Sequence, residues 1–155
     1  MIVPFILGSK QDLDHAKKIH AILDDYGIKH VTYVASAHKV PEKTLSIIKK
    51  YSEMKESIVF VTIAGRSNAL SGLVSANTHF PVVACPPFSD KADYLVNIHS
   101  TLQMPSETPA ITVVDPGNAG QAIVRILALT DKDLVKKIKN HIKVVQHSFD
   151  LKPQK

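Results

Sequence analysis

Length, composition and charge exclude several classes of protein. The chain has 155 residues, 45% hydrophobic and 21% charged, which is typical of one globular domain, here predicted over residues 1–155. No apolar run reaches the roughly 18–20 residues that span a bilayer, and the opening segment 1–5 lacks the basic region of a secretory signal. With Cys85 as its single cysteine the chain has no internal disulfide, so we expect a cytoplasmic protein with no membrane partner.

The formal net charge of +5 is concentrated in lysines late in the chain. A nucleic-acid-binding protein would interleave such cations with aromatic residues or carry a recognised motif, and the sequence shows neither pattern. A solvated helix surface accounts for most of these lysines, so we expect no nucleic-acid partner.

The first half of the chain alternates predicted strands and helices. Ile2–Leu7 reads as a buried strand, with the objection that Pro4 removes a donor from its hydrogen-bond ladder. Apolar residues at helical spacing predict a helix over Asp12–Tyr26. Val31–Ala35 is the second predicted strand, and Pro41 suits the first turn of the next helix.

The second half repeats the alternation. Strands are predicted over 57–63, 81–84 and 110–114, and helices over 69–76, 90–102 and 118–129. Strands that alternate with helices in this way predict right-handed crossovers and a parallel sheet covered on both faces. We therefore predict an α/β fold, a flavodoxin-like three-layer sandwich with a five-stranded parallel sheet.

One helical pattern, over residues 131–149, follows the last predicted strand and has no obvious place in a closed sandwich. Its apolar residues share one face: Leu134, Val135, Ile138, Ile142, Val145 and Phe149. That face needs a surface to cover, either on its own domain or, as we prefer, on a neighbouring subunit.

Three loops at strand ends carry most of the chemistry, because parallel α/β sheets bind ligands outside the carboxyl ends of their strands. After the first strand, Gly8 allows close approach of a ligand and Ser9 offers a hydroxyl. Asp12 could accept hydrogen bonds from a ribose diol, or it could simply cap the following helix.

The second loop contains Ser36, Ala37, His38 and Lys39. Serine and lysine can hold a phosphate, and histidine can move a proton at cellular pH. The other histidines fall on predicted helices or loop edges and are interpreted as surface or packing residues. His38 differs from them because it follows a strand and stands beside a cation.

The third loop, Ala64, Gly65, Arg66 and Ser67, is rich in small residues and opens a helix, which suits an anion. Arg66 could pair with an anionic ligand or with a surface acid. No zinc-ligand spacing occurs in the sequence, so no metal site is predicted. Cys85, between Ala84 and two prolines, is interpreted as a buried small residue rather than a nucleophile.

Together these segments resemble one known family. The runs GSKQD, SAHKVP, IAGRSNALSG and PVVACPP resemble, in register from about Val3 to Leu129, phosphoribosylaminoimidazole carboxylase of de novo purine synthesis. The resemblance implies a single AIR carboxylase catalytic domain that assembles into a homo-oligomer, an octamer or a tetramer. It also implies that the helix at 131–150 packs on a neighbouring subunit.

Two branches of the family differ in their substrate. One converts N5-carboxyaminoimidazole ribonucleotide (N5-CAIR) and typically has arginine after SAH and a histidine in the third loop. Here Lys39 and AGRSNALSG stand instead, which resembles the branch that uses carbon dioxide directly. Gln11 departs from the serine that is usual in the family, which puts one contact to the ribose phosphate in doubt.

The resemblance implies carboxylation of 5-aminoimidazole ribonucleotide (AIR) by CO₂ at C4 to give 4-carboxy-AIR (CAIR), without ATP, biotin, metal or other cofactor. It implies that His38 moves the C4 proton. The implied substrate-binding residues are Gly8, Ser9, Asp12, Ser36, Ala37, Lys39, Ala64, Gly65, Arg66 and Ser67.

Three alternatives remain at this point. The first is the mutase, which isomerises N5-CAIR. The second is a non-catalytic nucleotide-binding module, since the same fold hosts unrelated functions. The third is a nucleic-acid-binding protein, whose affinity would fall steeply with salt.

Overall fold

A computed structural model describes residues 1–150 of the chain, so the last five residues of the predicted domain lie outside the described part. Its strands form one parallel sheet in the order β2-β1-β3-β4-β5. The strands are β1 (Ile2–Leu7), β2 (Lys29–Val34), β3 (Phe60–Ile63), β4 (Val82–Ala84) and β5 (Ile111–Thr112). The helices are α1 (Leu13–Tyr26), α2 (Pro41–Ser52), α3 (Ala69–Ala76), α4 (Lys91–Leu102), α5 (Pro116–Leu127) and α6 (Lys132–His147), with short 3₁₀ turns over Lys10–Asp12 and Ala128–Thr130.

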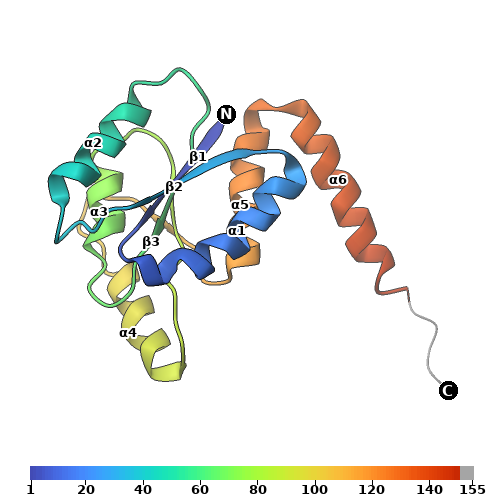
Figure 1. Ribbon diagram of the computed structural model, residues 1–155. Coiled ribbons are helices and arrows are strands. Elements are labelled where there is room, and N and C mark those ends of the chain that lie inside the picture. The colour runs from blue at the N-terminus through green and yellow to red at the C-terminus, as the bar shows by residue number, and fades with distance from the viewer. Residues whose placement is uncertain (151–155) are drawn as a thin grey trace.

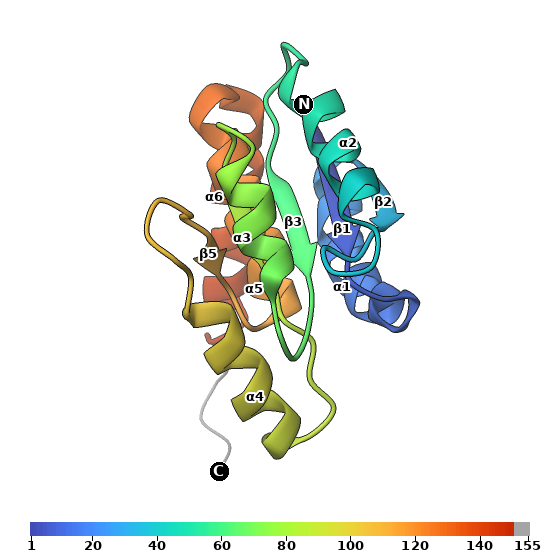
Figure 2. The same ribbon diagram turned by 90° about the vertical axis from the view of Figure 1, so that its left-hand side faces the viewer.

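Helices cover both faces of the sheet, as Figures 1 and 2 show. On one face α1, α5 and the start of α6 bury apolar side chains against the sheet, and on the other face α2 and α3 do so. The observed strand order is that of flavodoxin. The predicted three-layer α/β sandwich with a five-stranded parallel sheet is therefore confirmed. No helix within residues 1–150 is both long and apolar enough to cross a membrane.

Pro4 lies in a central strand after all, at a point where its missing donor is tolerated. Ile2 and Gly8 both donate from β1 toward the β3 side, to Ser57 O and Ile63 O, so the alternation of the strand turns the nitrogen of Pro4 to that side as well. The β1–β3 ladder starts only at Phe5, after an isolated bridge between Ile2 and Ile58. The nitrogen of Pro4 therefore faces β3 at a position where β1 and β3 are not paired, so its missing N–H leaves no hydrogen bond of the ladder unmade.

Several strands are shorter than the apolar runs that predicted them. The run at 57–63 contributes Phe60–Ile63 to β3, and the run at 110–114 contributes only Ile111–Thr112 to β5. The second strand is displaced and begins at Lys29, two residues before the predicted start. Apolar runs report burial, whereas strand bounds depend on where a neighbouring strand can pair.

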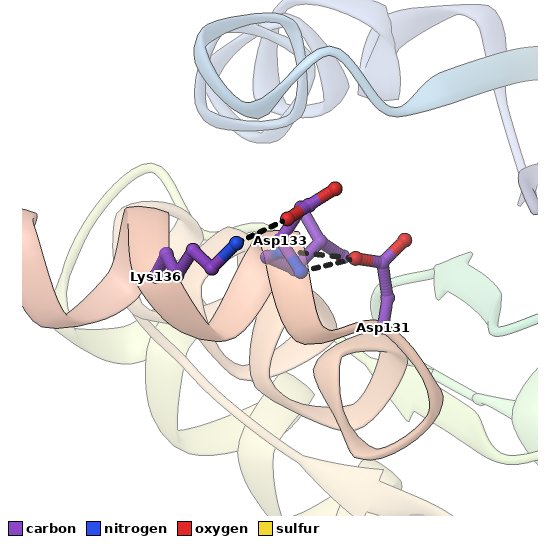
Figure 3. A network of polar contacts seen from close by, with 4 residues as sticks. Asp131, Asp133 and Lys136 are labelled. Atoms are coloured by element: carbon purple, nitrogen blue, oxygen red, sulfur yellow. Dashed lines mark hydrogen bonds and ion pairs between the residues drawn. The ribbon is translucent and has the colours of Figure 1, made fainter.

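The helix α6 starts with a well-made cap and then leaves the body of the molecule (Figure 1). Asp131 accepts hydrogen bonds from the amides of Asp133 and Leu134, each at 2.9 Å, and Asp133 pairs with Lys136 at 3.0 Å (Figure 3). Leu134 and Ile138 are buried in the core. The amino-terminal half of the helix is therefore anchored on its own chain.

His20 on α1, which stacks on His30 of β2, gives stability a dependence on pH. The rings of His20 and His30 lie 4.2 Å apart, the ring of Phe5 meets His20 edge-on, and Thr32 and Asp24 bond to His20 and His30 respectively. Burial, with a smaller effect of the neighbouring His30 and against the attraction of Asp24, lowers the pKa of His20 from 6.5 to about 4. Only the unfolded chain gains a proton here between these two values, so acidification favours unfolding.

We expect the free energy of unfolding to fall as the pH drops from about 6.5 toward 4, and His20→Leu to reduce this slope. Urea denaturation at pH 7 and at pH 4.5, for the wild type and the variant, measures it. His79→Leu, which alters an exposed histidine, serves as the control and should keep the wild-type slope. Equal slopes for the wild type and His20→Leu would show that other groups carry the effect.

Candidate active site

The loops after β1, β2 and β3 meet around one cavity of about 760 Å³ at the carboxyl ends of the strands. Every site residue predicted from the sequence lines it: Gly8, Ser9, Asp12, Ser36, Ala37, His38, Lys39, Ala64, Gly65, Arg66 and Ser67. The helix α4 lies beyond this end of the sheet (Figure 2) and closes part of the cavity through Asp93 and Asn97. Segments distant in the sequence are thus brought together as predicted.

The loop after β1 is built around a reciprocal cap. The Ser9 amide donates to the Asp12 carboxylate at 2.8 Å, and the Gln11 amide donates to the Ser9 hydroxyl at 3.2 Å. Asp12 does not cap α1 with its side chain, so the plain helix-cap interpretation is wrong for that helix. Burial raises the pKa of the Asp12 carboxyl, against the hydrogen bond from Ser9, which lowers it. A buried carboxylate held at the cavity wall can accept hydrogen bonds from a bound diol.

The loop after β2 is a turn that carries the imidazole of His38. Its ends are fixed, because the Val40 amide donates to Ser36 O at 3.0 Å and the buried Thr44 hydroxyl donates to Ala35 O at 3.2 Å. His38 and Lys39 are exposed in the single chain. The loop therefore offers a proton-transfer group and a cation on a turn that the adjacent helix holds in place.

The loop after β3 is held by the neighbouring strand and by α4. Gly8 donates to Ile63 O at 2.9 Å, which joins the first loop to the third. Arg66 adopts a left-handed backbone with φ 51°, and its amide donates to the side chain of Asn97. The amide of Arg66 is thus occupied, whereas the amides of Gly65 and Ser67 donate to no acceptor within residues 1–150.

His15 on α1 lines the cavity and contacts the single cysteine, which lies behind it in the core. His15 Nε2 lies 3.3 Å from Cys85 Sγ, and Cys85 is fully buried. Burial raises the pKa of the Cys85 thiol to about 12 and lowers the pKa of His15, whose decrease Lys18 enhances and Asp115 opposes. The thiol therefore stays protonated at neutral pH, which fits the interpretation of Cys85 as a buried small residue.

Sequence reasoning did not single out several residues that line the cavity. They are Asp14, His15, Lys18, Leu70, Pro87, Phe88, Ser89, Asp93 and Asn97, together with Gln11, which was noted only as a departure from a family pattern. Most lie on helices or in the loop after β4, outside the motifs. Within residues 1–150 no cluster of three His, Cys, Asp or Glu side chains could hold a metal ion.

Comparison with known proteins places these features in context. The AIR carboxylase family model matches residues 2–148. A phosphoribosylaminoimidazole carboxylase of Archaeoglobus fulgidus is 52% identical over 133 residues, which cover 86% of this chain and 72% of that protein. The human bifunctional phosphoribosylaminoimidazole carboxylase/phosphoribosylaminoimidazole succinocarboxamide synthetase is 38% identical over 130 residues, 83% of this chain but only 30% of that larger protein.

A solved structure agrees over the whole length. The crystal structure of Treponema denticola PurE superimposes with a TM-score of 0.88 at 35% identity, covering 98% of this chain and 99% of that one.

Proposed function

Because this chain belongs to the AIR carboxylase family, whose members act in purine biosynthesis, we propose that it carboxylates AIR with CO₂ at C4 to give CAIR. The observation that carries the proposal is the cavity on which His38, a diol acceptor, a cation and unoccupied backbone amides converge. The aminoimidazole ring is an enamine-like nucleophile at C4 and CO₂ is an electrophile, so their union needs no activated carboxyl carrier.

The ribose phosphate is anchored by the first two loops. The hydroxyls of Ser9 and Ser36 and the ammonium of Lys39 supply donors for the phosphate, and the Asp12 carboxylate accepts from the ribose hydroxyls. Anchoring the ribotide at these points brings C4 to a fixed position, which removes much of the entropic cost of the reaction.

Carbon dioxide and the carboxylate formed from it are held by the third loop. The amides of Gly65 and Ser67 are the available donors, since the amide of Arg66 is bonded to Asn97. Fixed donors directed at developing charge typically contribute about 3 kcal/mol each to catalysis. The guanidinium of Arg66, exposed at the cavity edge, adds positive charge where the carboxylate forms.

His38 moves the proton. When C4 attacks CO₂, the new carbon–carbon bond leaves C4 with both a hydrogen and a carboxylate. The imidazole of His38 accepts that hydrogen as a proton, which restores the aromatic ring, and returns it to C4 in the reverse reaction. General acid–base catalysis of this kind is worth about 10²- to 10⁴-fold in rate.

A direct assay distinguishes carboxylation from the mutase reaction. Lys39 and the third loop AGRSNALSG, without a histidine, favour the use of CO₂. We expect CAIR to form from AIR at a rate that rises with CO₂ concentration, without ATP, and to form slowly from N5-CAIR. Formation of CAIR from N5-CAIR alone, with no dependence on added CO₂, would assign the chain to the mutase branch.

We also propose that the exposed part of α6 packs on another copy of the chain. Past Ile138 the apolar stripe continues through Ile142 and Val145, which are 38% and 44% exposed, to Phe149 at 80%. A second copy that covers this stripe completes a homo-oligomer.

Substituting the stripe tests this assembly. We expect Ile142→Asp/Val145→Asp to lower the molar mass measured by light scattering, because a charge in an apolar interface is costly. Val144→Asp, on the opposite side of the same helix, should keep the wild-type mass. An unchanged mass in the double variant would contradict the proposal.

A further inference from the structure

Three side chains on one face of α4 accept hydrogen bonds from the third loop and from Asn68, which follows it. The Arg66 amide donates to the Asn97 carboxamide, the Asn68 amide donates to Ser100 Oγ at 2.7 Å, and Asn68 Nδ2 donates to Thr101 Oγ1 at 3.0 Å. The acceptors follow a spacing of three and four residues, so they share one side of the helix. The conformation of the loop is therefore determined by α4, a helix that contributes none of the motif residues.

Asn97 uses both ends of its carboxamide. Its Oδ1 accepts from Arg66, and its Nδ2 donates to Pro87 O at 2.6 Å. The residue is 3% exposed, and its own carbonyl accepts from Thr101 Oγ1 at 2.7 Å. A single buried side chain thus links the loop after β3 to the loop after β4, and a bond lost here leaves a buried group without a partner.

The contact also explains two backbone features of the third loop. A Cβ on Gly65 would lie 2.9 Å from Asn97 Nδ2, so only glycine fits against the carboxamide. Arg66, a non-glycine residue, holds a left-handed backbone that costs about 1–2 kcal/mol, and the bond to Asn97 compensates for this cost. With the amide of Arg66 turned to α4, the amides on either side remain for a ligand.

We propose that Asn97 is a positioning residue for the carboxylation step. It fixes the backbone of Gly65, Arg66 and Ser67 in the arrangement that receives CO₂ and the new carboxylate, and it takes no part in anchoring the ribotide. The inference rests on the proposed function, because it assigns the third loop to the carboxyl group.

Asn97→Ala tests it through the separation of kcat from KM. We expect kcat to fall about 10- to 100-fold, as displaced catalytic groups typically cause, and the KM for CO₂ to rise. The KM for AIR should stay within about threefold of the wild-type value. Asn97→Asp keeps an acceptor for the Arg66 amide but loses the donor to Pro87 O, so it should recover only part of the lost kcat.

Gly65→Ala is a second route to the same displacement, because the added methyl group forces the carboxamide of Asn97 to move. It should lower kcat and raise the KM for CO₂ as Asn97→Ala does. If Asn97→Ala fails to fold, Gly65→Ala tests the positioning role in its place. Asn77→Ala is the matched control: it removes a 2.8 Å bond to Leu73 O at the end of α3, away from the cavity, and should behave as wild type.

The outcomes separate the inference from the proposed function. A wild-type protein that turns over N5-CAIR but not AIR with CO₂ would refute the carboxylase proposal. The role of Asn97 would then be judged by the same loss of kcat on N5-CAIR, whose carboxyl group must also be held. Wild-type kcat in both Asn97→Ala and Gly65→Ala, or an equal loss of AIR affinity, would overturn the positioning role.

Discussion

Replacing His38 with asparagine is expected to lower kcat for carboxylation by at least about 100-fold while AIR binding stays within about threefold of the wild-type value. Asparagine has a similar volume and can form hydrogen bonds, but it cannot accept a proton from C4. In the proposed function the ribotide is held by other side chains, those of Ser9, Asp12, Ser36 and Lys39, so we expect its affinity not to depend on the imidazole. Steady-state kinetics and calorimetric titration with AIR measure the two quantities separately.

The proton-transfer role proposed for His38 predicts a second loss in the same variant. Exchange of the C4 hydrogen of AIR with solvent deuterium, if the wild type catalyses it, should be lost together with carboxylation. His79→Asn provides the control, since that histidine is exposed and does not line the cavity. Near wild-type turnover in His38→Asn would remove His38 from the mechanism.

Replacing Asp12 with alanine is expected to have the second large effect, because two functions meet in one carboxylate. The variant leaves the Ser9 amide, now bonded at 2.8 Å, without its acceptor, and it also removes the acceptor that we propose for the ribose hydroxyls. Hydrogen bonds to a charged group contribute about 1.5–3 kcal/mol, so we expect the KM for AIR to rise about 10- to 100-fold. The midpoint of urea denaturation should fall as well.

Asp12→Asn separates these two functions. The amide oxygen of asparagine can still accept from Ser9, so stability should remain close to the wild-type value, whereas ribose binding loses the negative charge and the KM for AIR still rises. Asp133→Asn, at a surface pair with Lys136, should change neither quantity. A wild-type KM in both Asp12 variants would show that the ribose is bound elsewhere.

The interior of the fold was largely predictable because periodicity and turn residues act locally. The spacing that predicted 12–26 corresponds to α1 together with the 3₁₀ turn before it, and Pro41 does open α2. The bounds of β3 and β5 were not predictable, since an apolar run indicates a buried segment whether or not a neighbouring strand pairs with it. Pro4 shows the same limit, because only the pairing pattern reveals that its missing donor faces a gap in the ladder.

The loop residues that line the cavity could be predicted from sequence motifs, whereas the residues that hold those loops in place, such as Asn97, could not. The carboxyl ends of parallel strands lie at one edge of a sheet, so three loops after three strands had to converge once the fold was right. Asn97 gave no comparable signal, since a polar residue on a helix is ordinary. The role that we propose for it rests on its contact with Arg66, which lies 31 residues earlier in the chain.

By itself, then, the amino-acid sequence determined the layered α/β architecture, the edge of the sheet where the cavity lies and the chemical groups that line it. These properties depend on residue type and on spacing along the chain. Only the tertiary structure decided which donors remain free and which side chains hold the loops. Hydrogen bonds between segments distant in sequence settle these questions, as when the carboxamide of Asn97 accepts from the amide of Arg66, while Gly65 and Ser67 on either side line the cavity.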